Sequence, residues 1–121
     1  MECVLWHHPR CSKSRRALEL LREAGAAPTV RVYMDDPPDA AELRAALARL
    51  GTTADALVRR GEARFAELGL EEADDETLLA ALAAHPELLQ RPVFLAGDRA
   101  VVGRPPERVL ELIETMREHD A

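Results

Sequence analysis

The first third of the chain alternates between short apolar runs and amphipathic stretches. Residues 2–7 form a mostly apolar run bounded by Pro9, which predicts a buried strand. Apolar residues recur at helical spacing over 14–24 and Gly25 follows, so this stretch predicts a helix. The alternating, β-branched segment 29–33 predicts a second strand. Because strand, helix and strand follow one another, the two strands are expected to run parallel.

In the rest of the chain, the spacing of apolar residues changes from helical to strand-like and then back to helical. Residues 37–51 carry apolar side chains at helical spacing, and 53–89 contains shorter helical pieces separated by glycines. Two short apolar segments, 93–96 and 100–102, are joined by Gly-Asp-Arg and predict a hairpin. An apolar stripe over 106–118 predicts a final helix.

This order of elements predicts an α/β fold. A parallel pair of strands followed by an antiparallel hairpin makes a mixed four-stranded sheet with flanking helices and a helical insert at about 39–90. A length of 121 residues fits one domain with a single core, so we expect residues 1–121 to form a single domain.

Composition and charge restrict the possible partners. Apolar residues make up 47% of the chain, yet no apolar run approaches the roughly 18 residues that span a bilayer. The N-terminus lacks the basic region and cleavage site of a signal peptide, so a cytoplasmic protein is expected. The net charge of −6 disfavours nucleic acid and anionic membrane as partners.

Four cations and no acid lie between Pro9 and Arg16, and this basic cluster surrounds Cys11. The cysteine falls where the first strand hands over to the first helix, so unpaired N–H groups and the helix dipole face it. Arg10, Lys13 and Arg15 add full charges, and His7 or His8 would add another when protonated. These effects favour the thiolate and also form an anion pocket. The segment therefore predicts a nucleophile beside an oxyanion site.

The second cysteine, Cys3, sits among apolar strand residues, which indicates a buried and inert thiol. An extended segment holds it too far from Cys11 for a disulfide. The position three after Cys11 is Ser14, so the two-thiol redox motif is absent and an intermediate needs an external thiol such as glutathione. The Ser14 side chain either hydrogen-bonds the thiolate or caps the helix, and both interpretations stay open.

The run His-His-Pro-Arg-Cys-Ser-Lys-Ser-Arg over 7–15 resembles the catalytic turn of the glutaredoxin-dependent arsenate reductases, the ArsC family, whose fold is thioredoxin-like (glutaredoxin-like). The resemblance covers nearly the whole chain in order. It continues through residues 33–38, 56–60, 67–70, 85–86, 90–93 and 103–107.

The resemblance implies a role for several residues. Cys11 matches the cysteine that attacks arsenate, and His7 matches a histidine thought to keep that cysteine ionised. Pro92 matches the cis-proline that faces the active site. The arginines that hold the oxyanion match Arg59, Arg91 and Arg104, and within the turn Ser14 and Arg15 are further candidates for holding it.

The family reaction begins with a thiol–arsenate adduct, which glutathione displaces before glutaredoxin completes reduction to arsenite. The resemblance therefore implies arsenate or a similar oxyanion as substrate, glutathione as co-substrate, no bound cofactor and a monomer. The chain departs from the best-studied pattern at His8, where Asn is usual, and at Ser12-Lys13, which replace Gly-Thr. It also ends soon after its last helix, as in the short ArsC/Spx-like branch.

Three other functions are less consistent with the sequence. Spx-type regulators share the fold and bind RNA polymerase, so a non-enzymatic binding module is the main alternative, although Ser14 removes their two-cysteine switch. A cysteine phosphatase would place an arginine six residues after the nucleophile, where this chain has Ala17. A metal site would have to combine Cys3, His7, His8 and Cys11, but neighbouring strand residues point to opposite faces, so no metal is expected.

Overall fold

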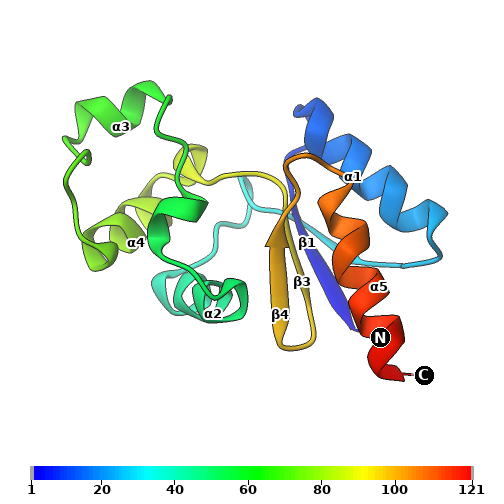
Figure 1. The fold of residues 1–121 in the computed structure, drawn as a ribbon. Coiled ribbons are helices and arrows are strands. Elements are labelled where there is room, and N and C mark those ends of the chain that lie inside the picture. Colours follow the sequence, from blue (N-terminus) through cyan, green and yellow to red (C-terminus); the bar gives the residue numbers. More distant parts are fainter. Residues whose placement is uncertain (1, 121) are drawn as a thin grey trace. The chain divides into compact units, whose positions relative to one another are not determined.

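The computed structural model describes residues 2–120, with side chains as far as Arg117. In chain order its helices and strands are β1 (Cys3–His7), α1 (Ser12–Glu23), β2 (Thr29–Val32), α2 (Ala40–Leu50), η1 (Ala54–Leu57), α3 (Ala63–Glu67), α4 (Asp75–Ala84), η2 (Pro86–Leu88), β3 (Val93–Ala96), β4 (Arg99–Val102) and α5 (Arg108–Asp120) (Figure 1). The two η elements are short 3₁₀ helices.

These elements form two compact units. The first unit contains the residues up to Val32 together with those from Arg91 onward, and the second unit contains Tyr33–Gln90. The second unit starts earlier than the insert of about 39–90 that the sequence predicts. The expectation of a single domain over 1–121 stays a prediction.

The first unit is built on a four-stranded sheet with the strand order β2-β1-β3-β4. β1 pairs with β2 in parallel, whereas β1–β3 and β3–β4 are antiparallel. Leu5, at the middle of β1, lies opposite Val30 on one side and Phe94 on the other. The predicted mixed sheet is therefore confirmed, with β1 as an inner strand.

Helices α1 and α5 lie together beside this sheet (Figure 1). Their apolar stripes meet the side chains of one sheet face, which explains why the helical period in the sequence becomes a buried stripe. The resulting core contains Cys3, Leu5, Ala17, Leu18, Leu20, Leu21, Phe94, Ala96, Val101, Val109, Leu112 and Ile113.

Helix α1 begins two residues earlier than the apolar pattern predicts. Cys11 has an extended backbone, with φ −93° and ψ 121°, and acts as the N-cap, so Ser12 is the first helical residue. The helix ends before Gly25, whose φ of +85° lies in the left-handed region that glycine adopts without strain. The extended backbone of Cys11 thus places this residue at the entrance of the helix.

The second unit contains α2, η1, α3, α4 and η2. At the start of α2, the Asp39 side chain accepts the N–H of Glu42 at 2.8 Å, and the Glu42 side chain accepts the N–H of Asp39 at 3.2 Å. Arg44 of α2 forms a 2.5 Å ion pair with Glu76 of α4. The first of the short helical pieces predicted within 53–89 is a 3₁₀ helix over Ala54–Leu57, and Val58 directly after it is extended and pairs with Leu89.

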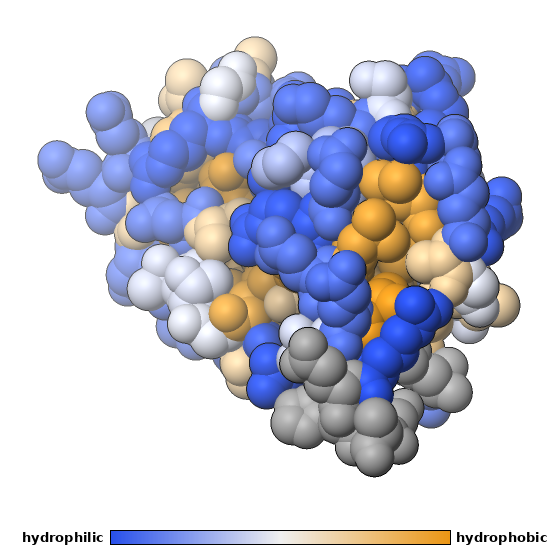
Figure 2. All heavy atoms as spheres, turned by 45° about the vertical axis from the view of Figure 1, so that its right-hand side comes forward, coloured by the Kyte–Doolittle hydropathy of each residue, from blue (hydrophilic) through white to orange (hydrophobic). Residues whose placement is uncertain are grey.

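On the face drawn in Figure 2, hydrophilic side chains predominate and apolar side chains are visible between them. Among the described residues, no helix is both long and apolar enough to cross a membrane.

Truncating Leu5 tests the position of the core. Its side chain is fully buried, so Leu5→Ala should lower the free energy of unfolding by about 2–5 kcal/mol through lost burial and a residual cavity. Leu68 is 41% exposed, and Leu68→Ala should change it by less than about 0.5 kcal/mol. Urea unfolding measures both variants, and equal losses would contradict the assigned core.

Candidate active site around Cys11

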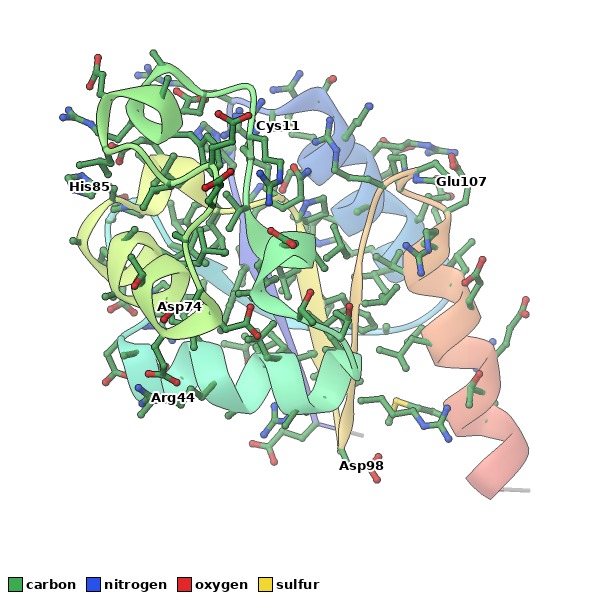
Figure 3. The ribbon with its side chains drawn as sticks, turned by 60° about the vertical axis from the view of Figure 1, so that its left-hand side comes forward. Cys11, Arg44, Asp74, His85, Asp98 and Glu107 are labelled. Carbon is green, nitrogen blue, oxygen red and sulfur yellow. The ribbon has the colours of Figure 1, made fainter. Side chains whose placement is uncertain are left out.

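Cys11 lies between β1 and α1, at the end of a tight turn (Figure 3). The N–H of Cys11 donates to the carbonyl of His8 at 3.0 Å, which closes the turn over four residues. The carbonyl of Cys11 accepts the N–H of Arg15 at 3.0 Å, which opens the helix. The side chain of Cys11 is therefore held in front of the first helical turn, where backbone N–H groups have no partner within the helix.

The thiol of Cys11 is only partly exposed, and opposing effects act on its ionisation. Burial by itself would raise the pKa of Cys11. The Ser14 N–H, the Arg91 guanidinium and the Lys13 N–H donate hydrogen bonds to the sulfur, and the charge of Arg91 adds to them. Together these donors outweigh burial, so the pKa of Cys11 lies below the ordinary value of a thiol.

Arg91 reaches this sulfur because of the strand register. β1 and β3 are antiparallel with Trp6 opposite Val93, so the chain just before β3 runs beside the turn that follows β1. The Nε atom of Arg91 is buried and has no hydrogen-bond partner among the described residues. A buried N–H without a partner is costly, and an oxygen of a bound anion would satisfy it. The peptide bond between Arg91 and Pro92 is cis.

Arg104 lies next to Arg91 in the first unit. Its Nη1 donates to the Arg91 carbonyl at 3.1 Å, and the Gly103 N–H donates to the Pro92 carbonyl at 2.9 Å. A Cβ on Gly103 would lie 2.9 Å from the Pro92 ring, which explains why this position has no side chain. The structure thus brings together Cys11, Arg91 and Arg104.

The contacts of the Ser14 hydroxyl differ from both predicted roles, which were a hydrogen bond to the thiolate and a cap of the helix. Its Oγ lies 2.7 Å from His7 Nδ1 and accepts the N–H of His8 at 3.0 Å, whereas the N-cap of α1 is Cys11. It is the backbone N–H of Ser14 that reaches the sulfur. The buried side chain therefore fastens the turn to the helix.

His7 also differs from its expected electrostatic role. The imidazole is buried, and burial lowers the pKa of His7, with the charges of His8, Arg22 and Arg15 acting in the same direction. A neutral His7 adds no positive charge to the thiolate. Its contact with Ser14 makes it a support for the turn instead.

The two remaining arginine candidates make hydrogen bonds with other residues. Arg15 is exposed, and its Nη1 donates to the Pro9 carbonyl at 2.9 Å. Arg59 belongs to the second unit, where its N–H donates to the Leu88 carbonyl at 2.7 Å and its Nη1 lies 3.4 Å from the Glu62 carboxylate. The oxyanion-binding roles of both arginines stay predictions.

Cys3 is a free, buried thiol at the start of β1. Burial raises the pKa of Cys3, and the nearby N-terminal charge offsets this only in part. Its protonated form is therefore favoured at neutral pH. Within the described residues, no three His, Cys, Asp or Glu side chains gather as a metal site would require.

The sequence analysis missed the contribution of Gly103 and of the Arg104 contact with the Arg91 carbonyl. A signal was available, because a glycine directly after a strand often marks a close approach of another backbone. The cis peptide bond between Arg104 and Pro105 was also not predicted.

Comparison with known proteins now identifies the family. Residues 6–119 match the model of the ArsC family. The chain belongs to the ArsC family. An arsenate reductase of Neisseria meningitidis serogroup A / serotype 4A (strain DSM 15465 / Z2491) is 46% identical over 111 residues, which cover 89% of this chain and 95% of that protein. The protein YfgD of Escherichia coli (strain K12), described as uncharacterized, is 44% identical over 112 residues, covering 90% and 94%.

A solved structure agrees with this membership. The arsenate reductase from Vibrio cholerae superposes with a TM-score of 0.88 at 41% identity, covering 92% of this chain and 97% of that one. The predicted fold class is therefore confirmed: this ArsC family member has the thioredoxin-like mixed sheet with flanking helices.

Removing Arg91 tests its contact with the thiolate. Arg91→Ala takes away one hydrogen bond and one positive charge, so the pKa of Cys11 should rise and its alkylation by iodoacetamide at neutral pH should slow. The pH dependence of alkylation, followed on the Cys11 peptide by mass spectrometry, measures this. Arg16→Ala is the matched control, because Arg16 pairs with Glu19 on the exposed side of α1. Equal profiles for the two variants would contradict the contact.

The neutral state of His7 predicts how stability depends on pH. Below the ordinary imidazole pKa of 6.5, the unfolded chain binds a proton that native His7 resists. Stability should therefore fall as pH drops from about 6.5 toward the lowered native pKa. His7→Asn retains a polar partner for Ser14 but cannot protonate, so urea unfolding between pH 7.5 and 5.5 should show a shallower loss. Identical slopes in wild type and variant would refute a neutral His7.

Proposed function

We propose that this chain is an arsenate reductase in which the Cys11 thiolate attacks arsenate. One observation carries the proposal: the sulfur accepts hydrogen bonds from a helix start and from Arg91, beside an Arg91 Nε that is buried and unpartnered. A stabilised nucleophile and an unsatisfied anion donor thus meet at one position. Relatives in Neisseria meningitidis and Rhizobium meliloti, which are 46% and 40% identical, are named arsenate reductases, and this favours arsenate as the anion.

The proposed oxyanion site uses the arginines that the family resemblance assigns. Arg91 and Arg104 come from either end of the β3–β4 hairpin, and by the family resemblance we assign the same oxyanion-binding role to Arg59. Within the nucleophile turn, the Ser14 N–H and the Arg15 charge complete the set. Each charge-assisted hydrogen bond to an anion contributes about 1.5–3 kcal/mol, so a few suffice for firm binding.

The chemistry proposed for Cys11 is a displacement followed by reduction. Its thiolate forms a sulfur–arsenic bond, and one arsenate oxygen leaves as water after protonation. Reduction of arsenic(V) to arsenic(III) takes two electrons, which two further thiols supply when they end as a disulfide. Ser14 stands where a resolving cysteine would be, so these thiols come from outside. We assign these two thiols to glutathione, whose sulfur replaces that of Cys11 on the arsenic, and to glutaredoxin, which completes the reduction.

The same proposal places the protein in the reducing cytoplasm as a monomer that needs no bound cofactor. Free thiols at Cys3 and Cys11 agree with a reducing compartment.

An arsenate reduction assay with glutathione and glutaredoxin tests the proposal. Cys11→Ser should lower turnover by at least a thousand-fold, because a hydroxyl is far less acidic and less nucleophilic than a thiolate. Arg91→Ala should weaken arsenate binding about 10- to 100-fold, the value of one charge-assisted hydrogen bond.

The outcomes separate the claims. Activity retained by the serine variant would remove Cys11 from the mechanism, and unchanged arsenate affinity in Arg91→Ala would remove that arginine from the site. Wild type without arsenate turnover that captures RNA polymerase would instead support the Spx-like binding module.

A further inference from the structure

The turn that carries Cys11 has an unusual residue at its first position. The turn spans His8, Pro9, Arg10 and Cys11 and is closed by the 3.0 Å bond from the Cys11 N–H to the His8 carbonyl. Proline at the second position fits, because its ring fixes φ near the required value. The first position usually carries Asp, Asn or Ser, whose side chain accepts the N–H two residues later. Here it carries a histidine.

The His8 side chain makes this bond itself. Its Nδ1 accepts the N–H of Arg10, two residues later, at 3.2 Å. An imidazole accepts at Nδ1 only when that nitrogen carries no proton. The ring nitrogen therefore occupies the place of the carbonyl oxygen in an asparagine turn.

The two main-chain groups of His8 belong to the same network. Its N–H donates to Ser14 Oγ at 3.0 Å, and its carbonyl accepts the Cys11 N–H. Three bonds from one residue therefore tie the end of β1, the tip of the turn and the first turn of α1 together. Losing the Nδ1 bond releases the Arg10 peptide, which directly precedes Cys11.

We infer that His8 is a positioning residue for the nucleophile: its Nδ1 fixes the peptide before Cys11 and so keeps the sulfur aligned with the N–H groups of α1. In the proposed reaction we assign His8 no contact with the arsenate. The alignment matters because hydrogen bonds weaken steeply once their angle departs from linearity. The effect on arsenate turnover rests on the proposed function, whereas the effect on thiol reactivity does not.

Two variants of His8 with side chains of nearly equal shape distinguish the effect of the hydrogen-bond acceptor from the effect of side-chain size. Asn and Leu have similar size and shape, but only Asn places an acceptor at the δ position. His8→Leu should slow iodoacetamide alkylation of Cys11 at neutral pH and lower kcat/KM for arsenate, each about five-fold, the value of one hydrogen bond. His8→Asn should stay within about two-fold of wild type in both assays.

Thermal unfolding of both variants checks whether any loss is merely structural. The inference requires the reactivity of Cys11 to differ between His8→Leu and His8→Asn by more than their difference in stability explains. Equal alkylation rates in the two variants would overturn it, with the proposed function intact if wild type still reduces arsenate. A five-fold difference in alkylation without any arsenate turnover in wild type would support the role of His8 and refute the proposed function.

Discussion

The active-site architecture depends on the hydrogen bonds that the sulfur of Cys11 accepts from the start of α1 and from Arg91. Burial of a thiol opposes its ionisation, and these donors more than compensate for that effect. A free thiol at its ordinary pKa is ionised to only a few per cent at neutral pH, and burial without these donors would lower that fraction further. The other contacts of the turn act by directing a donor toward this sulfur or by holding it in place.

The sheet topology brings the second donor, the Arg91 guanidinium, to the sulfur of Cys11. β1 is an inner strand, so the residues after it are flanked by the residues before β3. That antiparallel pairing brings Arg91 to Cys11 across about 80 residues of chain. The chain directly after β4 then passes close to Pro92, because Gly103 has no side chain. Arg104, the next residue, donates to the Arg91 carbonyl. One hairpin thus presents both arginines.

Much of this could be predicted from local patterns. Apolar period located all four strands, and the position of Cys11 between a strand and a helix predicted its low pKa. The partners of Ser14 and His7 could not be predicted, because a hydroxyl can satisfy its bonds locally or across a turn and only the folded rotamers decide. The start of the second unit at Tyr33 likewise differs from the insert boundary of about 39 that the sequence predicts.

Because His7 is neutral, different residues supply the positive charge beside the thiolate and the support of the turn. A protonated imidazole would add charge, but that charge would disappear as pH rises through the range in which imidazole titrates. A guanidinium stays charged throughout that range. Assigning the charge to Arg91 and the structural support to His7 therefore makes the positive charge beside the thiolate independent of histidine titration. The acidic limit of reactivity is then set by the protonation of Cys11 itself, and by whatever destabilises the turn that holds it.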